Sequence, residues 1–356
     1  MATPFTFETV DEGISAQGAV SLALDGSGNS RIAYTQQGSG QIVVARRDGG
    51  AWTKEQVSSG FVGLDSSLCL AIDSQGNPQL AYRDLNSSEL IHAVKGADRW
   101  VLTHIRTRLG GLPRPGGVDG IAFALHPGRL DRESRDVGYF VYTDLVHDGI
   151  GFAHTGNLGP TPVTVQEDQN DLLKFGHSSA TFDPSENFFV GYIGFFRSGS
   201  SQDTVSVRST HITNIETGTF ADPTVIESSP FINVKRSTSI VRTFGGGCLA
   251  YFDIANKTLK ARVSSVGSGV ERIETVAANI NAIVTPSAAQ NRGAFRVAFA
   301  DTDAIKLASR SQSGNWTVEI VDGVSGGTPS VAYDNSGKAN IAYAVGGKLK
   351  YATRTE

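Results

Sequence analysis

The feature that most constrains the fold of this 356-residue chain is an internal repeat. In each copy, an apolar run meets a tight turn of Asp, Gly and Asn and then continues into a second apolar run. The clearest copies are residues 21–34 (SLALDGSGNSRIAY), 70–82 (LAIDSQGNPQLAY) and 330–343 (SVAYDNSGKANIAY). This pattern is typical of a β-hairpin, so the chain is expected to be built from repeated hairpins.

Two further runs follow the hairpins at residues 21–34 and 70–82, so the repeat unit has four strands. Trp52, Trp100 and Trp316 open the fourth run in three of the units. An aromatic residue recurs in the second strand at Tyr34, Tyr82, Tyr142, Tyr192, Tyr251, Phe299 and Tyr343. Seven four-stranded units at this period predict an all-β fold, a seven-bladed β-propeller that occupies residues 1–356 as a single domain.

The ends of the chain predict how the ring closes. The seventh unit reaches the C-terminus after its third strand, and residues 4–10 (PFTFETV) have the pattern of the missing fourth strand. We therefore expect the N-terminal strand to pair beside residues 348–353. Such pairing would remove an exposed sheet edge.

The turns at residues 25–29, 73–77 and 334–338 resemble the Asp-box hairpins of sialidase-type propellers. The fourth unit keeps only residues 183–187 (DPSEN), and the fifth and sixth units depart further. In the sialidase-type propellers this hairpin is structural. The resemblance therefore implies a fold and carries no activity with it.

Composition excludes several classes of function. Lys and Arg number 31 against 35 Asp and Glu, so a basic face for nucleic acid is not expected. No apolar run approaches the roughly 18 residues of a membrane span, and the N-terminus lacks a signal-peptide pattern. We expect a cytoplasmic protein, a monomer or small homo-oligomer, with secretion left open if a leader has been removed. Two Cys and seven widely placed His predict no metal and no cofactor.

The loops on the two faces of the propeller differ in composition. Turns between the first and second strands are polar, whereas loops on the opposite face are rich in apolar residues. Apolar clustering in loops predicts a central funnel that binds an apolar small molecule, with packing between blades as the alternative. The substrate-binding candidates are Phe61, Leu64, Leu173, Phe175, Phe195, Phe196, Phe231, Val234 and Ile283.

His177 is the main candidate for chemistry. It occupies a position in the fourth unit where the inner strands of other units carry mainly small hydroxyl residues. A histidine there can act as acid, base or hydrogen-bond donor near neutral pH, although a structural role is the alternative. Asp119, Lys235 and Arg236 complete the candidate catalytic set, and Tyr142 and His147 are further candidate ligand contacts.

An apolar funnel without cofactor motifs resembles the fungal natural-product propellers that catalyse hetero-Diels–Alder additions. That resemblance implies cyclisation or cycloaddition of a terpenoid or polyketide, promoted by positioning and hydrogen bonding. Whether the chain is an enzyme stays open. The alternatives are a carbohydrate-binding lectin, a lyase or glycosidase-like propeller acting on a uronate, and a scaffold for protein partners. The three Trp residues on outer strands disfavour the lectin, because lectin funnels need aromatic platforms.

Overall fold

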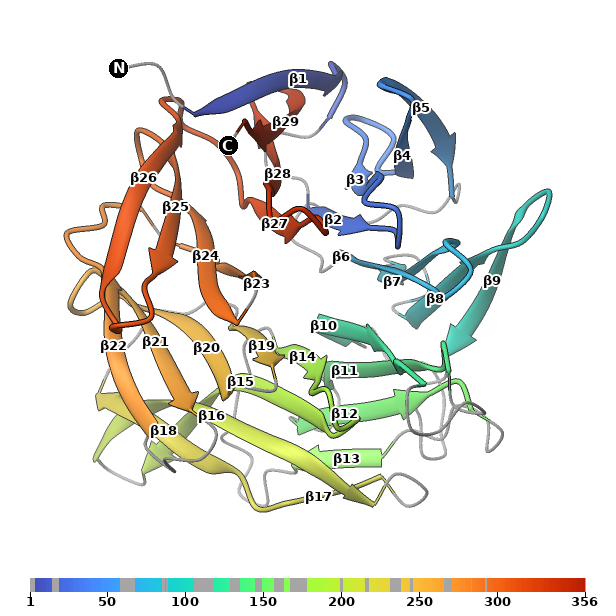
Figure 1. Ribbon diagram of the computed structural model, residues 1–356. Coiled ribbons are helices and arrows are strands. Elements are labelled where there is room, and N and C mark those ends of the chain that lie inside the picture. Colours follow the sequence, from blue (N-terminus) through green and yellow to red (C-terminus); the bar gives the residue numbers. More distant parts are fainter. Residues whose placement is uncertain are drawn as a thin grey trace.

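The computed structural model describes most of the chain, including at least part of every expected strand. The described residues are 4–14, 19–57, 68–84, 87, 89–105, 118–128, 135–144, 149–156, 163–166, 178–198, 201–214, 218–230, 238–243, 246–265, 271–282, 284–291 and 293–355. They form seven antiparallel sheets arranged around a ring, and they contain no helix (Figure 1). The predicted seven-bladed β-propeller is confirmed. No helix in this part of the chain is long and apolar enough to cross a membrane.

The blades are numbered from the first complete unit, and each is given from its innermost strand outwards. Blade 1 contains β2 (Val20–Leu24), β3 (Ser30–Thr35), β4 (Ile42–Asp48) and β5 (Ala51–Gln56). Blade 2 contains β6 (Leu68–Ile72), β7 (Pro78–Asp84), β8 (Glu89–Lys95) and β9 (Trp100–Ile105). Blade 3 contains β10 (Val118–Leu125), β11 (Gly138–Asp144), β12 (Gly149–His154) and β13 (Val163–Gln166).

Blade 4 departs from the four-stranded plan. It contains β14 (Ser179–Phe182), β15 (Phe188–Ser198) and β16 (Ser201–Asn214), and β16 pairs with both β17 (Thr219–Phe220) and β18 (Thr224–Pro230). The long β15 also changes one expectation. Phe195 and Phe196 lie within this strand, paired with Val205 and Thr204, rather than in a connecting loop.

The remaining blades return to four strands. Blade 5 contains β19 (Ser239–Thr243), β20 (Gly246–Asp253), β21 (Thr258–Ser265) and β22 (Glu271–Ala277). Blade 6 contains β23 (Ser287–Asn291), β24 (Ala294–Ala300), β25 (Ile305–Arg310) and β26 (Trp316–Asp322). Blade 7 contains β27 (Ser330–Tyr333), β28 (Ala339–Val345), β29 (Lys348–Arg354) and β1 (Phe5–Asp11).

The ring closes through the two ends of the chain, as the sequence predicts. β1 pairs antiparallel with β29, from Phe5 opposite Arg354 to Asp11 opposite Leu349. The backbone N–H of Thr355 also donates to the carbonyl oxygen of Pro4 at 2.8 Å. In Figure 1 the blue β1 covers the outer edge of the red β29. The backbone groups of β29 are therefore paired on both sides.

The polar turns owe their shape to one carboxylate each. Oδ1 of Asp25 accepts hydrogen bonds from the backbone N–H of Ser27 and of Asn29, both at 2.9 Å. Asp73 and Asp183 accept the equivalent pairs in blades 2 and 4. The fourth turn residue has a positive φ, and Gly28 and Gly76 supply it at little cost. We call the face that carries these turns the turn face.

The core is divided among the blade interfaces. Seven clusters of buried apolar side chains occur among the described residues, one between each pair of neighbouring blades. The recurring second-strand aromatics lie in these clusters, and Tyr34, Tyr192 and Tyr343 are fully buried. Some buried hydroxyls bond an acid of the preceding blade. Tyr34 donates to Asp11 at 2.5 Å, Tyr251 to Glu227 at 2.7 Å and Tyr343 to Asp322 at 2.6 Å.

Serine hydroxyls link the innermost strands of neighbouring blades. Oγ of Ser21 accepts from the backbone N–H of Leu70 at 3.0 Å, and Oγ of Ser330 accepts from that of Leu22 at 2.9 Å. Ser239 and Ser287 make the same contact in blades 5 and 6. These bonds satisfy N–H groups that face the hub and have no strand partner there.

Candidate functional site

A cavity with a volume of about 470 Å³ lies at the hub on the turn face. Its walls come from the ends of the innermost strands of blades 3, 4, 5 and 6 and from the turns that follow them. The apolar lining residues are Ala124, Leu125, Pro127, Phe182 and Pro184. The polar lining residues are Thr181, Asp183, Arg242, Thr243 and Gln290. We call this cavity the hub pocket.

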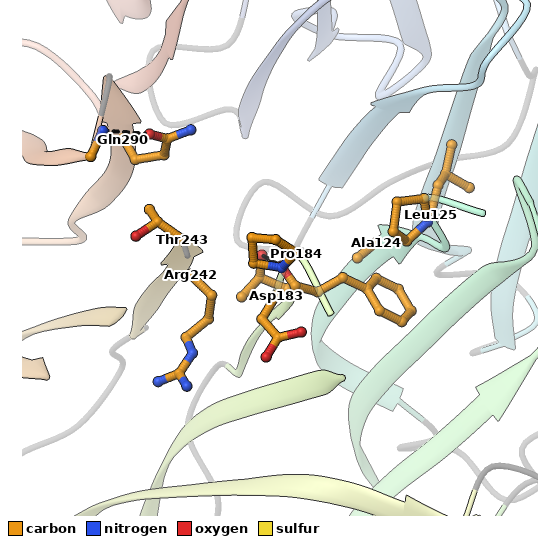
Figure 2. Close-up of a pocket in the computed structure, with 11 residues that line it drawn as sticks. Ala124, Leu125, Asp183, Pro184, Arg242, Thr243 and Gln290 are labelled. Carbon is orange, nitrogen blue, oxygen red and sulfur yellow. Dashed lines mark hydrogen bonds between the residues drawn. The ribbon is translucent and has the colours of Figure 1, made fainter. Parts of the chain in front are cut away.

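Figure 2 shows how different blades supply the two sides of the hub pocket. Arg242, Thr243 and Gln290 come from β19 and β23 and lie on one side of Pro184, whereas Ala124 and Leu125 of β10 lie on the other. All lining residues of the hub pocket come from the four neighbouring blades 3 to 6. The pocket therefore lies to one side of the propeller axis, away from blades 1, 2 and 7.

Aromatic packing holds one wall of the hub pocket in place. The ring centroid of Phe182 lies 4.9 Å from that of Tyr139 and 5.0 Å from those of His126 and Phe188. Tyr139 and Phe188 are themselves buried in the interface between blades 3 and 4. Such edge-to-face and tilted contacts fix the ring, so Phe182 offers a preformed apolar surface.

Asp183 makes the same hydrogen bonds in its turn as Asp25 does in blade 1. Its Oδ1 accepts from the N–H groups of Ser185 and Asn187, both at 2.9 Å, and its Oδ2 accepts from Nδ2 of Asn187 at 3.0 Å. Gln290 differs, because its Oε1 accepts from the N–H of Gly293 at 3.2 Å while Nε2 has no partner among the described residues. The exposed Gln290 amide is thus a donor available to a ligand.

Arg242 is the cation of the hub pocket. Its Cζ lies 3.9 Å from the ring centroid of Phe189, in the range of a cation–π contact. Burial lowers the pKa of Arg242, and Asp183 and Glu271 oppose that shift while Arg262 adds to it. A guanidinium stays protonated at neutral pH in such a setting, so the pocket lining holds one cation, Arg242, beside the carboxylate of Asp183.

A second, smaller cavity of about 220 Å³ lies between blades 4 and 5. Its lining includes Phe189, Ser209, His211, Arg262 and Glu271, and it shares Arg242 with the hub pocket. Arg262 donates from Nη1 to Oγ of Ser209 at 2.7 Å and pairs with Glu271 through Nη2. The second cavity therefore has its own neutralised ion pair, and Arg242 marks its border with the hub pocket.

Most of the residues predicted to form the funnel lie outside the described part of the chain. These are Phe61, Leu64, His147, Leu173, Phe175, His177, Phe231, Val234, Lys235, Arg236 and Ile283. Asp119 in β10 and Phe195 and Phe196 in β15 are described as backbone only. The funnel and its proposed catalytic group therefore stay predictions.

Tyr142 is the one predicted site residue whose side chain is described. It is 1% exposed and packs in the interface between blades 2 and 3, with Phe140 and Ile105 in the same cluster. A Cβ on Gly151 would lie 2.3 Å from the Tyr142 ring, so the ring lies across that glycine. The structure thus places Tyr142 in the core, like the aromatics at the same position in other blades.

Two neighbouring loop residues follow the alternative of packing between blades. Ile280 is 2% exposed and Val284 is 1% exposed, and both belong to the cluster between blades 5 and 6. Among the residues that can be described, no group of three His, Cys, Asp or Glu side chains is arranged to hold a metal ion.

Sequence reasoning misses the hub pocket, although one signal for it is visible. The innermost strand of blade 5 reads SIVRT and carries a charge, whereas those of blades 1, 2 and 7 read VSLAL, LCLAI and SVAY. A single arginine on an inner strand can pack against its own protein or face a ligand. The pattern of residues in the strand does not distinguish these two roles.

Comparison with known proteins identifies the fold and no family. No protein-family profile matches the chain, and no curated protein matches its sequence. Virginiamycin B lyase from Staphylococcus aureus superposes with a TM-score of 0.58 at 15% identity, covering 98% of this chain and 99% of that one. An α-L-arabinanase from Penicillium chrysogenum complexed with arabinobiose gives 0.54 at 12% identity, covering 98% and 97%.

A lectin from Aleuria aurantia in complex with Fucalpha1-6GlcNAc gives a TM-score of 0.52 at 14% identity, covering 96% of this chain and 93% of the lectin. At these identities, the likeness to all three proteins shows the propeller architecture and nothing about shared residues.

Proposed function

We propose that this protein binds a small polar ligand of the carbohydrate class in the hub pocket. The observation that carries the proposal is the composition of that pocket, in which a fixed apolar wall faces an uncommitted amide and a cation. A volume of about 470 Å³ is suited to a mono- or disaccharide-sized molecule.

Sugars match such a lining because they present two kinds of surface. Their C–H faces pack on apolar side chains such as Phe182 and Pro184, and their hydroxyls need donors and acceptors at the ring edge. Gln290 supplies the donor. The hydroxyls of Thr181 and Thr243 donate to the backbone carbonyls of Phe182 and Gly246, both at 3.3 Å, and their oxygens can accept. Specific pockets combine mostly apolar walls with a few placed polar groups in this way.

Sugars occur among the ligands of propellers with a similar fold. Two of the superposed propellers are described in complex with arabinobiose and with Fucalpha1-6GlcNAc. Cyclisation of a terpenoid-like substrate depends on His177 and on loop residues outside the described ranges. That hypothesis remains a prediction without support from the hub pocket, whose lining is mixed rather than apolar.

The proposal specifies one site per chain. Blades 1, 2 and 7 keep regular Asp turns, and the hub pocket uses blades 3 to 6, of which only blade 4 keeps such a turn in its sequence. Calorimetric titration with a panel of neutral and acidic mono- and disaccharides tests this. We expect a stoichiometry of about one for at least one sugar, and no heat from any of them would refute the proposal.

A matched pair of variants locates the site. Gln290→Ala removes the uncommitted amide and should weaken sugar binding by about fivefold or more, the loss of one net hydrogen bond. Gln75→Ala removes an exposed glutamine from the turn between β6 and β7 of blade 2 and should leave affinity unchanged. Equal effects of the two variants would contradict binding at the hub pocket.

A further inference from the structure

We infer that Arg242 is an anion receptor and that the ligand of the hub pocket is an acidic sugar whose carboxylate pairs with this guanidinium. The inference rests on the proposed function and adds the charge of the ligand to it. Four observations carry it: the missing counter-ion of Arg242, its stacking, the glycine that makes room for it, and its place between the two cavities.

The first observation is that Arg242 has no carboxylate partner among the described residues. Its one hydrogen bond there runs from Nη1 to Oγ of Ser264 at 3.4 Å, and its buried Nε has no partner in the same part of the chain. Arg31 and Arg310, in contrast, lie 3.1 Å and 2.6 Å from carboxylate oxygens of Asp25 and Glu274. A half-buried cation without a counter-ion is costly unless a ligand completes it.

Nearby acids do not fill this role. Asp183 makes the same turn hydrogen bonds as Asp25 but, unlike Asp25, has no arginine within ion-pair distance among the described contacts, and Glu271 pairs with Arg262. Both influence Arg242 through their charge, but neither comes within the 4.0 Å of an ion pair among the described contacts. The guanidinium thus keeps several N–H donors for an incoming anion.

The second and third observations concern how Arg242 is held. The guanidinium stacks on Phe189, with Cζ 3.9 Å from the ring centroid. A Cβ on Gly247 would lie 2.6 Å from both Cδ and Nη1 of Arg242, so only glycine leaves space for the side chain in this position. A planar cation fixed on a ring is preorganised for two-point contact with a carboxylate.

The fourth observation sets the geometry of the ligand. Arg242 lines both the hub pocket and the smaller cavity between blades 4 and 5. A sugar ring in the hub pocket would therefore direct its carboxylate toward blade 5. The neutral edge would remain on the side of Gln290, where an amide donor suits hydroxyls. A uronate, with one carboxylate and several hydroxyls on one ring, has this distribution.

The test compares each acid with its own neutral form. The probes are the methyl glycosides of D-glucuronate, D-galacturonate and D-mannuronate, each beside its methyl ester, titrated calorimetrically into the full chain at low salt. We expect at least one acid to bind about tenfold or more tightly than its ester, as for a charge-assisted hydrogen bond. If an ester binds as well as its acid throughout, the inference fails and the proposed function stands. If no sugar binds, both fail.

Variants assign the preference to Arg242. Arg242→Gln should reduce the affinity for the acid to that for the ester while leaving the ester unaffected. Gly247→Ala keeps the charge but displaces the guanidinium, so it should have the same effect in weaker form. Arg46→Gln removes an exposed cation from blade 1 and should change neither affinity. Melting temperatures of all variants exclude unfolding as the cause, and an unchanged acid preference in folded Arg242→Gln would overturn the inference.

Discussion

At the scale of single residues, the blades are joined by tyrosine hydroxyls paired with acids. Tyr343 donates to Asp322 of blade 6 at 2.6 Å, and Nζ of Lys350 lies 2.9 Å from the same carboxylate. Tyr34 with Asp11 and Lys54 repeats this arrangement one blade further along the ring. Each acid thus binds two side chains of the next blade. The recurrent second-strand aromatic serves the fold, which agrees with the buried position of Tyr142.

Removing one of these hydroxyls should be measurable. Tyr343→Phe leaves Asp322 with Lys350 alone and should lower the free energy of unfolding by about 2 kcal/mol, as for a hydrogen bond to a charged group. Urea unfolding at neutral pH measures the change. Phe299, which occupies the same position in blade 6, shows that the ring itself is tolerated there without a hydroxyl. No loss of stability would contradict a structural role for the bond.

His92 makes stability depend on pH. It is 5% exposed, its Nε2 lies 2.9 Å from Oε1 of Gln79, and burial lowers its pKa to about 4. In the unfolded chain, the histidine has its ordinary pKa of about 6.5. Between pH 6.5 and 4, the unfolded chain therefore binds a proton at His92 and the folded chain does not. Stability from this residue is therefore complete above about pH 6.5 and decreases as the pH falls toward 4, by about 3 kcal/mol at most.

The contribution of His92 can be isolated by substitution. His92→Gln removes the titrating group, so its unfolding free energy should fall less between pH 6.5 and 4 than that of the unchanged protein. Urea unfolding at several pH values measures both slopes. Parallel slopes would show that His92 titrates alike in the folded and unfolded chain.

At the scale of elements, the hairpin turn explains the repeat that the sequence shows. One carboxylate and one residue with positive φ define the turn, so Asp25 and Gly28 recur as Asp73 and Gly76 and as Asp334 and Gly337. Glu186 adopts φ 65° in blade 4 without being glycine. Its turn keeps the Asp183 bonds, so a glycine is not required at the fourth position when the carboxylate is present.

Substitution by alanine should change the free energy of unfolding differently at the two glycines of one turn. Gly28 has φ 84°, so Gly28→Ala should cost about 1 kcal/mol from left-handed backbone strain alone, since the nearest neighbour of the new Cβ lies at an ordinary 3.6 Å. Gly26→Ala introduces a Cβ with nothing within 4 Å and no positive φ, and should be neutral or slightly stabilising. Thermal unfolding of both variants tests this, and equal costs would be inconsistent with the described backbone.

At the scale of the whole molecule, the ring is closed by a strand that the sequence locates within one residue. Phe5 of β1 is 5% exposed and packs in the cluster between blades 6 and 7, whereas Phe7 is 42% exposed. Phe5→Ala should cost about 3–5 kcal/mol, and Phe7→Ala about 1 kcal/mol or less. Chemical unfolding distinguishes them. Similar small losses would mean that β1 does not contribute to closing the ring.

The fold follows from the sequence because it repeats, and the site does not because it depends on differences between repeats. Alternating apolar runs and Asp turns fix strand order and blade number, and residues 4–10 reveal the closure. To predict the hub pocket, one would have to know that three residues far apart along the chain meet at one side of the hub. These residues are Asp183, Arg242 and Gln290. Loop composition indicates the opposite face instead, and the residues concerned lie outside the described ranges.

The most direct test of the central claim is to map where a bound sugar perturbs the protein. Side-chain amide and backbone resonances are followed by NMR while the tightest-binding sugar is titrated in. One off-centre site predicts shifts at Gln290, Thr243 and Asp183, with the equivalent turns of blades 1, 2 and 7 unchanged. Shifts of similar size in all seven turns, or shifts confined to residues outside the turn face, would contradict it.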